Sequence, residues 1–212
     1  MIYGLLIETA TERGLVALSK NDQLLEAVEL PFGYQNSKTL LPAIDLLLKN
    51  WKLIPTDLSF IAVGAGPGSY TGLRVGVAAA KGLCFACHLP VIALSTLDAF
   101  LPEKGVAIID AKIGGAYILH PGEEVKVLPL EQIKLNSGTR IVTPQANSLR
   151  KKWEKLYPNV ELVWEEKGPN PERMVRLAWA KWEKKEYSRE GEVEILYLRK
   201  TQAEIEREQK NG

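Results

Sequence analysis

The segment G-A-G-P-G-S-Y-T-G-L-R, residues 64–74, carries the clearest fold signal in the chain. It follows an apolar run at residues 59–65 that predicts a buried strand, and it precedes a predicted helix that ends near Cys87. Glycines at such a junction let a ligand or a second backbone approach closely, and the free N–H groups of a helix start favour an anion. The segment is not a P-loop, because it lacks the Gly-Lys-Ser/Thr ending that holds phosphate and magnesium.

The helix after this segment is apolar on almost every side. Its only charged residues are Arg74 and Lys81. Gly72, Gly76 and Ala80 form a ridge of small side chains at positions i, i+4 and i+8 of the helix. We interpret this ridge as the contact surface for a helix of another molecule. Packing against the protein's own sheet is the alternative.

A second apolar helix, capped by Ser37 or Thr39, is predicted to run to about Trp51. A start at Leu40 would place Pro42 in the first turn, where a missing N–H costs no internal hydrogen bond. Its apolar side chains cover far more than one stripe of about 100°, so we expect nearly the whole helix to be hidden. Together the two helices predict a partner or dimer interface. The residues assigned to this interface are Leu40, Leu41, Ile44, Leu47, Leu48, Gly72, Val75, Gly76, Ala79 and Ala80.

The wider pattern predicts the same structural unit twice. In each half three short strands come first, and helices then alternate with strands. This order predicts an α/β protein with a two-lobed actin-like ATPase (ribonuclease H-like) fold, built from duplicated βββαβα units. Pro102 separates a predicted N-terminal lobe, residues 1–101, from a C-terminal lobe, residues 102–212, whose charged tail at 200–212 is expected to fray. The predicted strands lie at residues 2–8, 14–19, 23–30, 59–65, 90–94, 105–110, 116–120, 124–128, 140–143 and 160–164, and further helices follow Ser95 and occupy 144–157 and 171–187.

Composition excludes several classes of protein. Hydrophobic residues make up 46% and charged residues 25% of the chain, which suffices for a packed core and excludes a disordered protein. The net charge of +1 gives no global attraction to a nucleic-acid backbone. We expect a cytoplasmic protein without a membrane partner, because the sequence has no transmembrane run, no signal-peptide pattern and only two cysteines. Residues 1–101 hold 15 of the 53 charged side chains, so part of the first lobe's surface is predicted to be covered.

The stretch G-P-G-S-Y-T-G-L-R-V-G, residues 66–76, resembles the signature of the bacterial tRNA threonylcarbamoyladenosine biosynthesis family TsaB, also called YeaZ. Shorter stretches are similar too: L-L-I-E-T-A-T at 5–11, S-T-L at 95–97, I-D-A-K at 109–112 and Y-L-R at 197–199. The sequence departs from the family pattern at Glu8, Asn36 and Gly115, where Asp, His and Glu are common. On this resemblance the family's signature loop comprises Gly66, Pro67, Gly68, Ser69, Thr71, Gly72 and Arg74.

The resemblance implies a function and a set of partners. It implies a non-catalytic subunit of the complex that makes N6-threonylcarbamoyladenosine at position 37 of tRNA. The implied partners are a TsaD-type threonylcarbamoyltransferase, which would hold the metal and the transfer chemistry, and a TsaE-type ATPase. The two helices of the N-terminal lobe would make both homodimer and heterodimer contacts, and tRNA would be met only as part of the complex. No cofactor of its own is implied, and a nucleotide at the partner interface is left open.

The residues themselves argue against an independent enzyme. An actin-like ATPase needs two glycine-rich hairpins, each led by an Asp, around the phosphates. The first hairpin, residues 8–12, has no glycine, and Glu12 would repel phosphate; the second keeps Asp110, Gly114 and Gly115. The carboxylates are too few for a two-metal nuclease, and no His-Glu-x-x-His motif exists for a zinc peptidase, so no catalytic residue and no metal site are predicted.

Two other functions stay open on the sequence. The second hairpin would suit a stand-alone nucleotide-binding enzyme, such as a small-metabolite kinase or ATPase. A homodimeric regulatory module is the other hypothesis. Cys84 and Cys87 are interpreted as core thiols rather than a haem attachment site. Basic residues at 150–155 are interpreted as a solvated helix face, with tRNA contact as the alternative.

Overall fold

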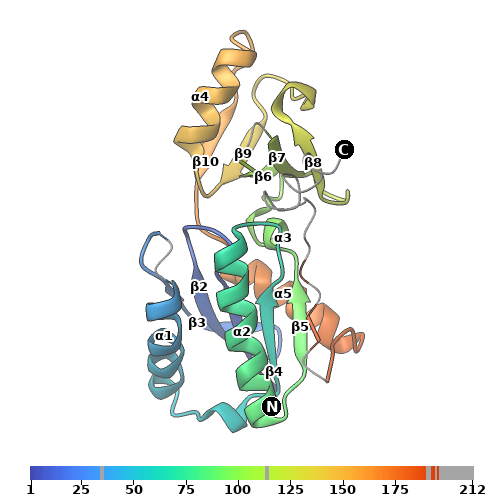
Figure 1. The fold of residues 1–212 in the computed structure, drawn as a ribbon. Helices are drawn as coiled ribbons and strands as arrows, with labels where there is room; N and C mark the ends of the chain where they lie inside the picture. Colours follow the sequence, from blue (N-terminus) through green and yellow to red (C-terminus); the bar gives the residue numbers. More distant parts are fainter. Residues whose placement is uncertain (34–35, 113–114, 190–191, 194, 196–212) are drawn as a thin grey trace, which may run out of the picture.

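The computed structural model describes residues 1–33, 36–112, 115–189, 192–193 and 195 of the 212-residue chain. Within these residues the strands form two separate five-stranded sheets, with strand orders β3-β2-β1-β4-β5 and β10-β9-β6-β7-β8. Figure 1 shows the two sheets one above the other, with the helices packed around them. No helix in the described ranges is long and apolar enough to cross a membrane.

The first sheet begins as an antiparallel meander of β1 (Tyr3–Glu8), β2 (Leu15–Lys20) and β3 (Gln23–Glu29). β4 (Phe60–Gly64) pairs parallel with β1, and β5 (Val91–Leu94) pairs parallel with β4. β4 is buried along its whole length, because helices cover both faces of this sheet. Its continuous apolar sequence follows from that position.

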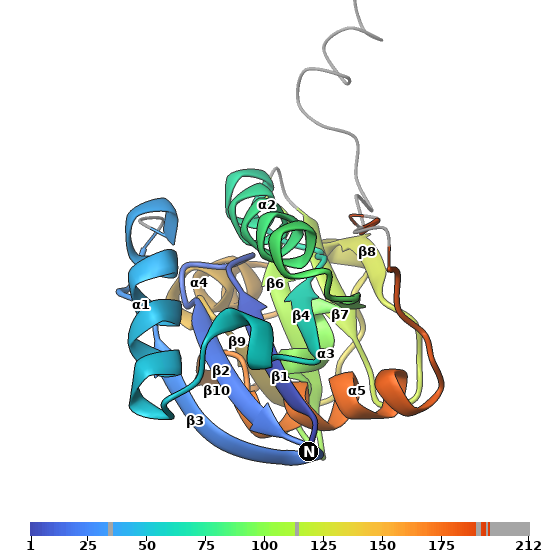
Figure 2. The same ribbon diagram turned by 90° about the horizontal axis from the view of Figure 1, so that it is seen from below.

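Helices cover the two faces of the first sheet. α1 (Asn36–Asn50) and α2 (Tyr70–Cys87) lie side by side on one face, as Figures 1 and 2 show, and their buried side chains form one core cluster with that face. α3 (Thr96–Phe100) and α5 (Pro171–Glu183) pack in the second cluster, on the other face. Ser95 and Asn170 cap these two helices through their side-chain oxygens, as their residue types favour.

The second sheet repeats the pairing of the first. β6 (Val106–Asp110), β7 (Gly115–Leu119) and β8 (Lys126–Pro129) form an antiparallel meander. β9 (Arg140–Thr143) runs parallel to β6, and β10 (Val163–Glu166) runs parallel to β9. α4 (Ala146–Leu156) buries Leu149 and Trp153 against this sheet. Short 3₁₀ turns occupy Pro55–Asp57 and Leu130–Gln132.

α5 comes late in the sequence but packs on the first sheet. Met174 and Ala178 are fully buried there, and the ring of Trp182 stacks on Phe60 at 5.1 Å between centroids. Both residues belong to the core cluster on that face of the sheet. The assignment of residues 102–212 to one lobe stays a prediction, and α5 shows that the later half of the chain also completes the earlier core.

α1 begins at Asn36, before both of the predicted cap residues Ser37 and Thr39. The helix includes Asn36, so Pro42 lies inside it and not in its first turn. The missing N–H of Pro42 leaves the carbonyl of Lys38 without its helical partner, and both residues are exposed, so water can serve that carbonyl. The helix is therefore hidden on one face only. Leu41 and Leu46 are 56% and 54% exposed, which corrects the expectation of a wholly hidden helix.

Candidate functional site

The signature loop lies against the chain's own β1–β2 turn. Ser69 donates its backbone N–H to the carbonyl of Ala10 at 2.7 Å, and Gly66 accepts a hydrogen bond from the N–H of Thr96 at 2.8 Å. A Cβ at Gly68 would collide with the Ala10 carbonyl oxygen. The glycines thus allow a close backbone approach within this molecule. Pro67 follows a cis peptide bond, and the Ser69 hydroxyl caps α2 by accepting from the N–H of Gly72.

The ridge of small residues on α2 faces inward. A Cβ at Gly72 would collide with the carbonyl oxygen of Thr9, and a Cβ at Gly76 would collide with the Thr9 hydroxyl oxygen. That hydroxyl donates to the carbonyl of Gly72 at 2.8 Å, and Ala80 is fully buried. The expectation that a partner's helix packs on this ridge is corrected accordingly. β1 and the turn after it fill the place, which is the alternative that the sequence left open.

Most of the other residues assigned to the interface also face the core of this chain. Leu41, at 56% exposed, is the member of that set that is open to solvent, and Val75 and Ala79 are half-buried. Because most of the predicted interface residues are buried, a partner protein cannot reach them. The predicted partner contact therefore needs other residues on the surface. The buried α1 members are Leu40, Ile44, Leu47 and Leu48.

α1 and α2 also expose apolar residues on their solvent side, between exposed charged residues such as Lys49 and Lys81, and we call these apolar residues the α1–α2 face. It comprises Leu41, Leu46 and Phe85, which are 56%, 54% and 87% exposed, together with Ala78 and Gly82. A Cβ at Gly82 would meet nothing within 4 Å. Sequence reasoning missed Phe85 because the flanking cysteines pointed to a core position. The signal that could have found it is the helix's excess of apolar residues over what one sheet can cover.

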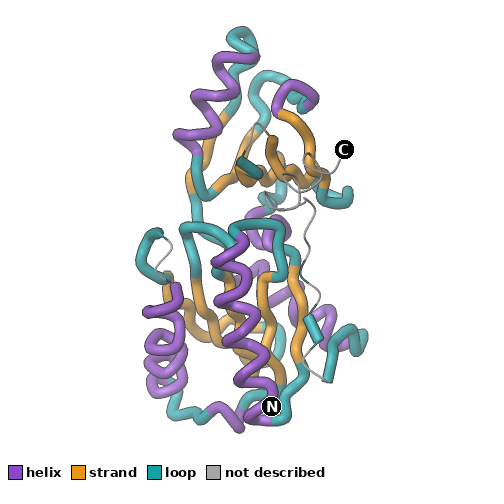
Figure 3. Tube along the Cα trace, in the orientation of Figure 1, coloured by secondary structure: helices purple, strands orange, loops and turns teal. Residues whose placement is uncertain are grey.

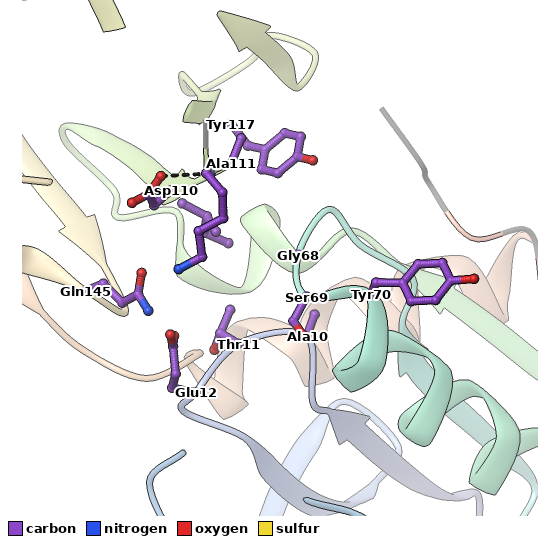
Figure 4. A pocket seen from close by; sticks show the side chains of 12 residues that line it. Ala10, Thr11, Glu12, Gly68, Ser69, Tyr70, Asp110, Ala111, Tyr117 and Gln145 are labelled. Carbon is purple, nitrogen blue, oxygen red and sulfur yellow. Dashed lines mark hydrogen bonds between the residues drawn. The ribbon is translucent and has the colours of Figure 1, made fainter. Parts of the chain in front are cut away.

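A cavity of about 340 Å³ opens where the loops of the two sheets meet. We call it the central cleft, and Figure 4 shows the side chains that converge on it from both sheets. The β1–β2 turn, the start of α2, the end of β6 and the residue before α4 all contribute to it. Its lining residues are Ala10, Thr11, Glu12, Gly68, Ser69, Tyr70, Ile109, Asp110, Ala111, Lys112, Tyr117 and Gln145.

Glu8 and Asp110 occupy equivalent places, each at the carboxyl end of the first strand of its sheet. Each accepts a hydrogen bond from the backbone N–H two residues on, Glu8 from Ala10 at 2.7 Å and Asp110 from Lys112 at 2.8 Å. Asp110 also pairs with the ammonium of Lys152 at 2.7 Å, so that lysine is not part of a merely solvated helix face. The second hairpin is described only in part, because Gly114 lies outside the described residues.

The buried position of Glu8 changes its acidity. Desolvation raises the pKa of its carboxyl from 4.5 to about 7, although hydrogen bonds from the backbone of Ala10 and the hydroxyl of Thr96 oppose the rise. The carboxylate lies so close to Gly64 that a Cβ there would collide with it. A glutamate fits at this position because residue 64 has no side chain.

The side chains that could bind a metal or take part in redox chemistry were searched among the described residues. The described residues contain no group of three or more His, Cys, Asp or Glu side chains placed to hold a metal ion. Cys84 is buried, as the sequence predicts, and desolvation raises the pKa of its thiol to about 11. Cys87 is half-buried.

Arg13 links the β1–β2 turn to the second sheet at the edge of the central cleft. Its guanidinium donates to the carboxylate of Glu166 at 2.6 Å and to the carbonyl of Pro144 at 3.2 Å. The other carboxylate oxygen of Glu166 accepts the N–H of Ala146 at 2.9 Å, at the first turn of α4. The hydrogen bond from Arg13 is the largest cause of the lowered pKa of Glu166.

We expect Arg13→Ala to raise the pKa of Glu166 toward the ordinary range of a glutamate, because the substitution removes its charged partner. The two side chains are about one-third exposed, so the free energy of unfolding should fall by only about 1 kcal/mol. A carbon-detected NMR titration of Glu166 measures the effect. Arg150→Ala, which removes a partner of Glu154 instead, is the control. An unchanged titration of Glu166 in Arg13→Ala would contradict the link.

Known proteins resemble this chain in sequence. The family model described as TsaD, tRNA N6-adenosine threonylcarbamoyltransferase, matches residues 34–128. The tRNA threonylcarbamoyladenosine biosynthesis protein TsaB of Haemophilus influenzae is 38% identical over 121 residues, which cover 53% of this chain and 51% of that protein. The chain thus spans about half the length of the curated TsaB relatives that it matches.

Solved structures resemble the chain over nearly its whole length. A crystal structure from Pseudomonas aeruginosa, described as an uncharacterized protein with similarity to peptidase YEAZ, gives a TM-score of 0.79 at 25% identity and covers 94% of this chain and 100% of that one. Component A of the (R)-2-hydroxyglutaryl-CoA dehydratase of Acidaminococcus fermentans, with a TM-score of 0.50 at 10% identity over 87% of this chain and 99% of that one, shares the fold alone. The predicted actin-like, ribonuclease H-like fold is confirmed. In sequence and in fold, the chain is similar to proteins of the TsaB/YeaZ family.

Proposed function

We propose that this chain is a non-catalytic subunit of the complex that modifies adenosine 37 of tRNA to N6-threonylcarbamoyladenosine. Its role is to bind and support a TsaD-type threonylcarbamoyltransferase together with a TsaE-type ATPase in the cytoplasm. Similarity to the tRNA threonylcarbamoyladenosine biosynthesis proteins TsaB supports the proposed pathway. The observation that carries the binding role is the α1–α2 face, where Leu41, Leu46 and Phe85 lie open to solvent on neighbouring helices.

The α1–α2 face has the character of a protein contact. Exposed apolar side chains are normal singly, but three large ones gathered on one pair of helices indicate a covered surface. Phe85 can act as an aromatic anchor, since such residues contribute most to binding at protein interfaces. Ala78 and Gly82 leave the backbone of α2 open to close approach. The same face would serve a homodimer of the isolated chain and the contact with the transferase, so the two assemblies would compete.

The experiment compares the wild-type chain with the double variant Leu41→Glu/Phe85→Glu in binding to the cognate TsaD-type protein. We expect the double variant to bind at least about 100-fold more weakly, because it places two charges in a contact that excludes water. Both residues are exposed in the single chain, so the fold should be retained. Isothermal calorimetry measures the affinity, and sedimentation of each chain alone measures the homodimer.

Leu156→Glu is the matched control, because Leu156 is an exposed leucine at the end of α4, on the other sheet. It should bind like the wild type. Wild-type affinity in the double variant would show that the α1–α2 face is not the contact. No complex at micromolar concentrations of the two folded wild-type proteins would overturn the proposed function itself.

The nucleotide-binding alternative has one observation in its favour, the central cleft with Asp110 at its wall. The Asp110 carboxylate is already held by Lys152 and by the backbone, and Glu12 adds a second carboxylate where a phosphate would lie. We therefore rank this function second. ATP turnover by the purified chain alone, abolished by Asp110→Ala, would reverse the order.

A further inference from the structure

Exposed cations accompany the α1–α2 face on both helices. The charged side chains of the two helices are Lys38, Asp45 and Lys49 on α1, and Arg74 and Lys81 on α2. Asp45 pairs with Lys49 at 2.7 Å. Among the described residues, no carboxylate forms an ion pair with Lys38, Arg74 or Lys81, and all three side chains are exposed. We call these three residues the flanking cations.

The spacing along each helix places the flanking cations beside the apolar side chains of the face. On α2, Arg74, Lys81 and Phe85 occupy positions i, i+7 and i+11, which lie on one side of a helix. On α1, Lys38 and Leu41 are at positions i and i+3 and share a side in the same way. A molecule that covers the apolar side chains therefore also meets the positive charges.

The helix ends add to this positive charge. Both helices begin at the β1–β2 turn, where the side chain of Asn36 donates to the carbonyl of Thr9 and the backbone N–H of Ser69 donates to that of Ala10. The two helices run in the same direction, away from the second sheet (Figure 1), so their positive dipole ends lie at the same end of the face. Neither first turn holds an acidic residue, and the first turn of α1 holds Lys38.

The carboxylates of the neighbouring strand β3 do not offset this charge. Glu26 accepts a hydrogen bond from the side chain of Asn50, the last residue of α1, at 3.0 Å. Asn50 is about 18 Å along the helix from Lys38, which is about twice the screening length at physiological salt. Glu29 points to the other face of the sheet, because its neighbour Val28 packs in the core beneath α1.

The combination of large apolar side chains and cations decides which kind of molecule fits. A nucleic-acid backbone would neutralise the cations but would leave Leu41, Leu46 and Phe85 in contact with water. In a symmetric dimer, a second copy would cover these apolar side chains but would bring like charges together across the contact. A different protein that carries both apolar side chains and carboxylates matches both features.

We propose that the flanking cations select a different protein over a second copy of this chain, because that protein places carboxylate side chains opposite Lys38, Arg74 and Lys81 around an apolar centre. This inference rests on the proposed function and specifies the surface of the partner that the α1–α2 face meets. The apolar side chains supply the contact that excludes water, and the flanking cations set the choice of partner and the rate of association.

Salt distinguishes the two assemblies. The dissociation constants of the complex with the cognate TsaD-type protein and of the homodimer are measured at about 50 mM and about 500 mM NaCl. We expect the higher salt concentration to weaken the complex at least about tenfold and to strengthen the homodimer, because screening removes an attraction in one and a repulsion in the other. A complex whose affinity does not change with salt would overturn the proposal, as would a homodimer that is tighter at the lower salt concentration.

The triple variant Lys38→Gln/Arg74→Gln/Lys81→Gln removes the flanking cations and keeps the apolar side chains. At about 50 mM NaCl it should bind the TsaD-type protein at least about tenfold more weakly than the wild type, chiefly through slower association, and its affinity should vary little with salt. Surface plasmon resonance gives both rate constants. All three residues are exposed, so the fold should be retained, and circular dichroism checks it.

Lys134→Gln/Lys151→Gln/Lys155→Gln is the matched control, because it removes the same number of exposed lysine or arginine charges from the part of the chain that packs on the second sheet. It should bind like the wild type. Equal losses in the two triple variants would show that net charge and not position matters, and would overturn the proposal. Binding of tRNA to the chain alone that only the first triple variant loses would assign the cations to nucleic acid instead. Failure of the proposed function looks different, because the wild type then forms no complex at either salt concentration.

Discussion

Gly76→Leu should lower the free energy of unfolding by about 3 kcal/mol, which is a large part of the stability of a domain of this size. Any Cβ at this position would collide with the hydroxyl oxygen of Thr9, and Ile7 lies 3.6 Å away, so a leucine has no space beside β1. The Thr9 hydroxyl would also lose its hydrogen bond to the carbonyl of Gly72. Urea unfolding followed by circular dichroism measures the change.

The control lies on the same helix, six residues further on. Gly82→Leu makes the same chemical change, but a Cβ at Gly82 meets nothing within 4 Å. Leucine has a better helix propensity than glycine, so this variant should be as stable as the wild type or more stable by up to about 1 kcal/mol. Equal losses in both variants would show that helix–sheet contact at Gly76 is not the cause. Wild-type stability of Gly76→Leu would contradict the close packing of Gly76 against Thr9.

These two glycines show what the sequence of a helix can and cannot predict. Small residues at i and i+4 indicate that something approaches the helix closely, but the pattern carries no information about which element approaches. At Gly76 it is the chain's own first strand. Phe85 on the same helix is 87% exposed, so α2 does carry more apolar residues than its own sheet covers. The prediction that the small-residue ridge is the exposed part was wrong.

Most elements could be predicted because their signals are local. Continuous apolar runs bounded by glycine, proline or polar residues predict β4 and β5, and Ser95 before a short apolar helix predicts α3. The start of α1 was missed because Pro42 reads as a first-turn residue, whereas an exposed Pro is tolerated deeper in a helix. The placement of α5 on the first sheet depends on contacts distant in sequence, such as Trp182 with Phe60.

The central cleft was predictable only in part. Glu12 was recognised as unfavourable for phosphate, because its position in the first hairpin follows from the strand order. That Glu12 is 8% exposed and lines the cleft could not be predicted, since its burial depends on how the second sheet closes over the turn. Lys152 is similar: its helix position predicts a solvated side chain, and only the three-dimensional arrangement brings it to Asp110.

Glu8→Gln should abolish a pH dependence of stability that the wild type shows between about pH 4.5 and 7. The folded state holds the pKa of Glu8 at about 7, against 4.5 for the ordinary group, because burial disfavours the charged form. Between these two values the folded chain binds a proton that the unfolded chain has released, so this contribution is complete below pH 4.5 and is lost as pH rises to about 7. The difference amounts to about 3 kcal/mol.

The glutamine variant isolates the effect of Glu8 ionisation on stability, because glutamine keeps the shape and both hydrogen bonds of the side chain. Its amide oxygen can accept from the N–H of Ala10, and its amide N–H can donate to the hydroxyl of Thr96, which lies 3.0 Å from the present carboxylate. Its stability should match that of the wild type at about pH 4 and exceed it by about 3 kcal/mol at about pH 8. Urea unfolding at each pH measures the difference, and an NMR titration of the Glu8 carboxyl gives its midpoint directly. A midpoint near 4.5, or a difference between the two chains that does not vary with pH, would show that Glu8 is solvated in the folded protein, and the tight contact between its carboxylate and Gly64 would then have to be abandoned.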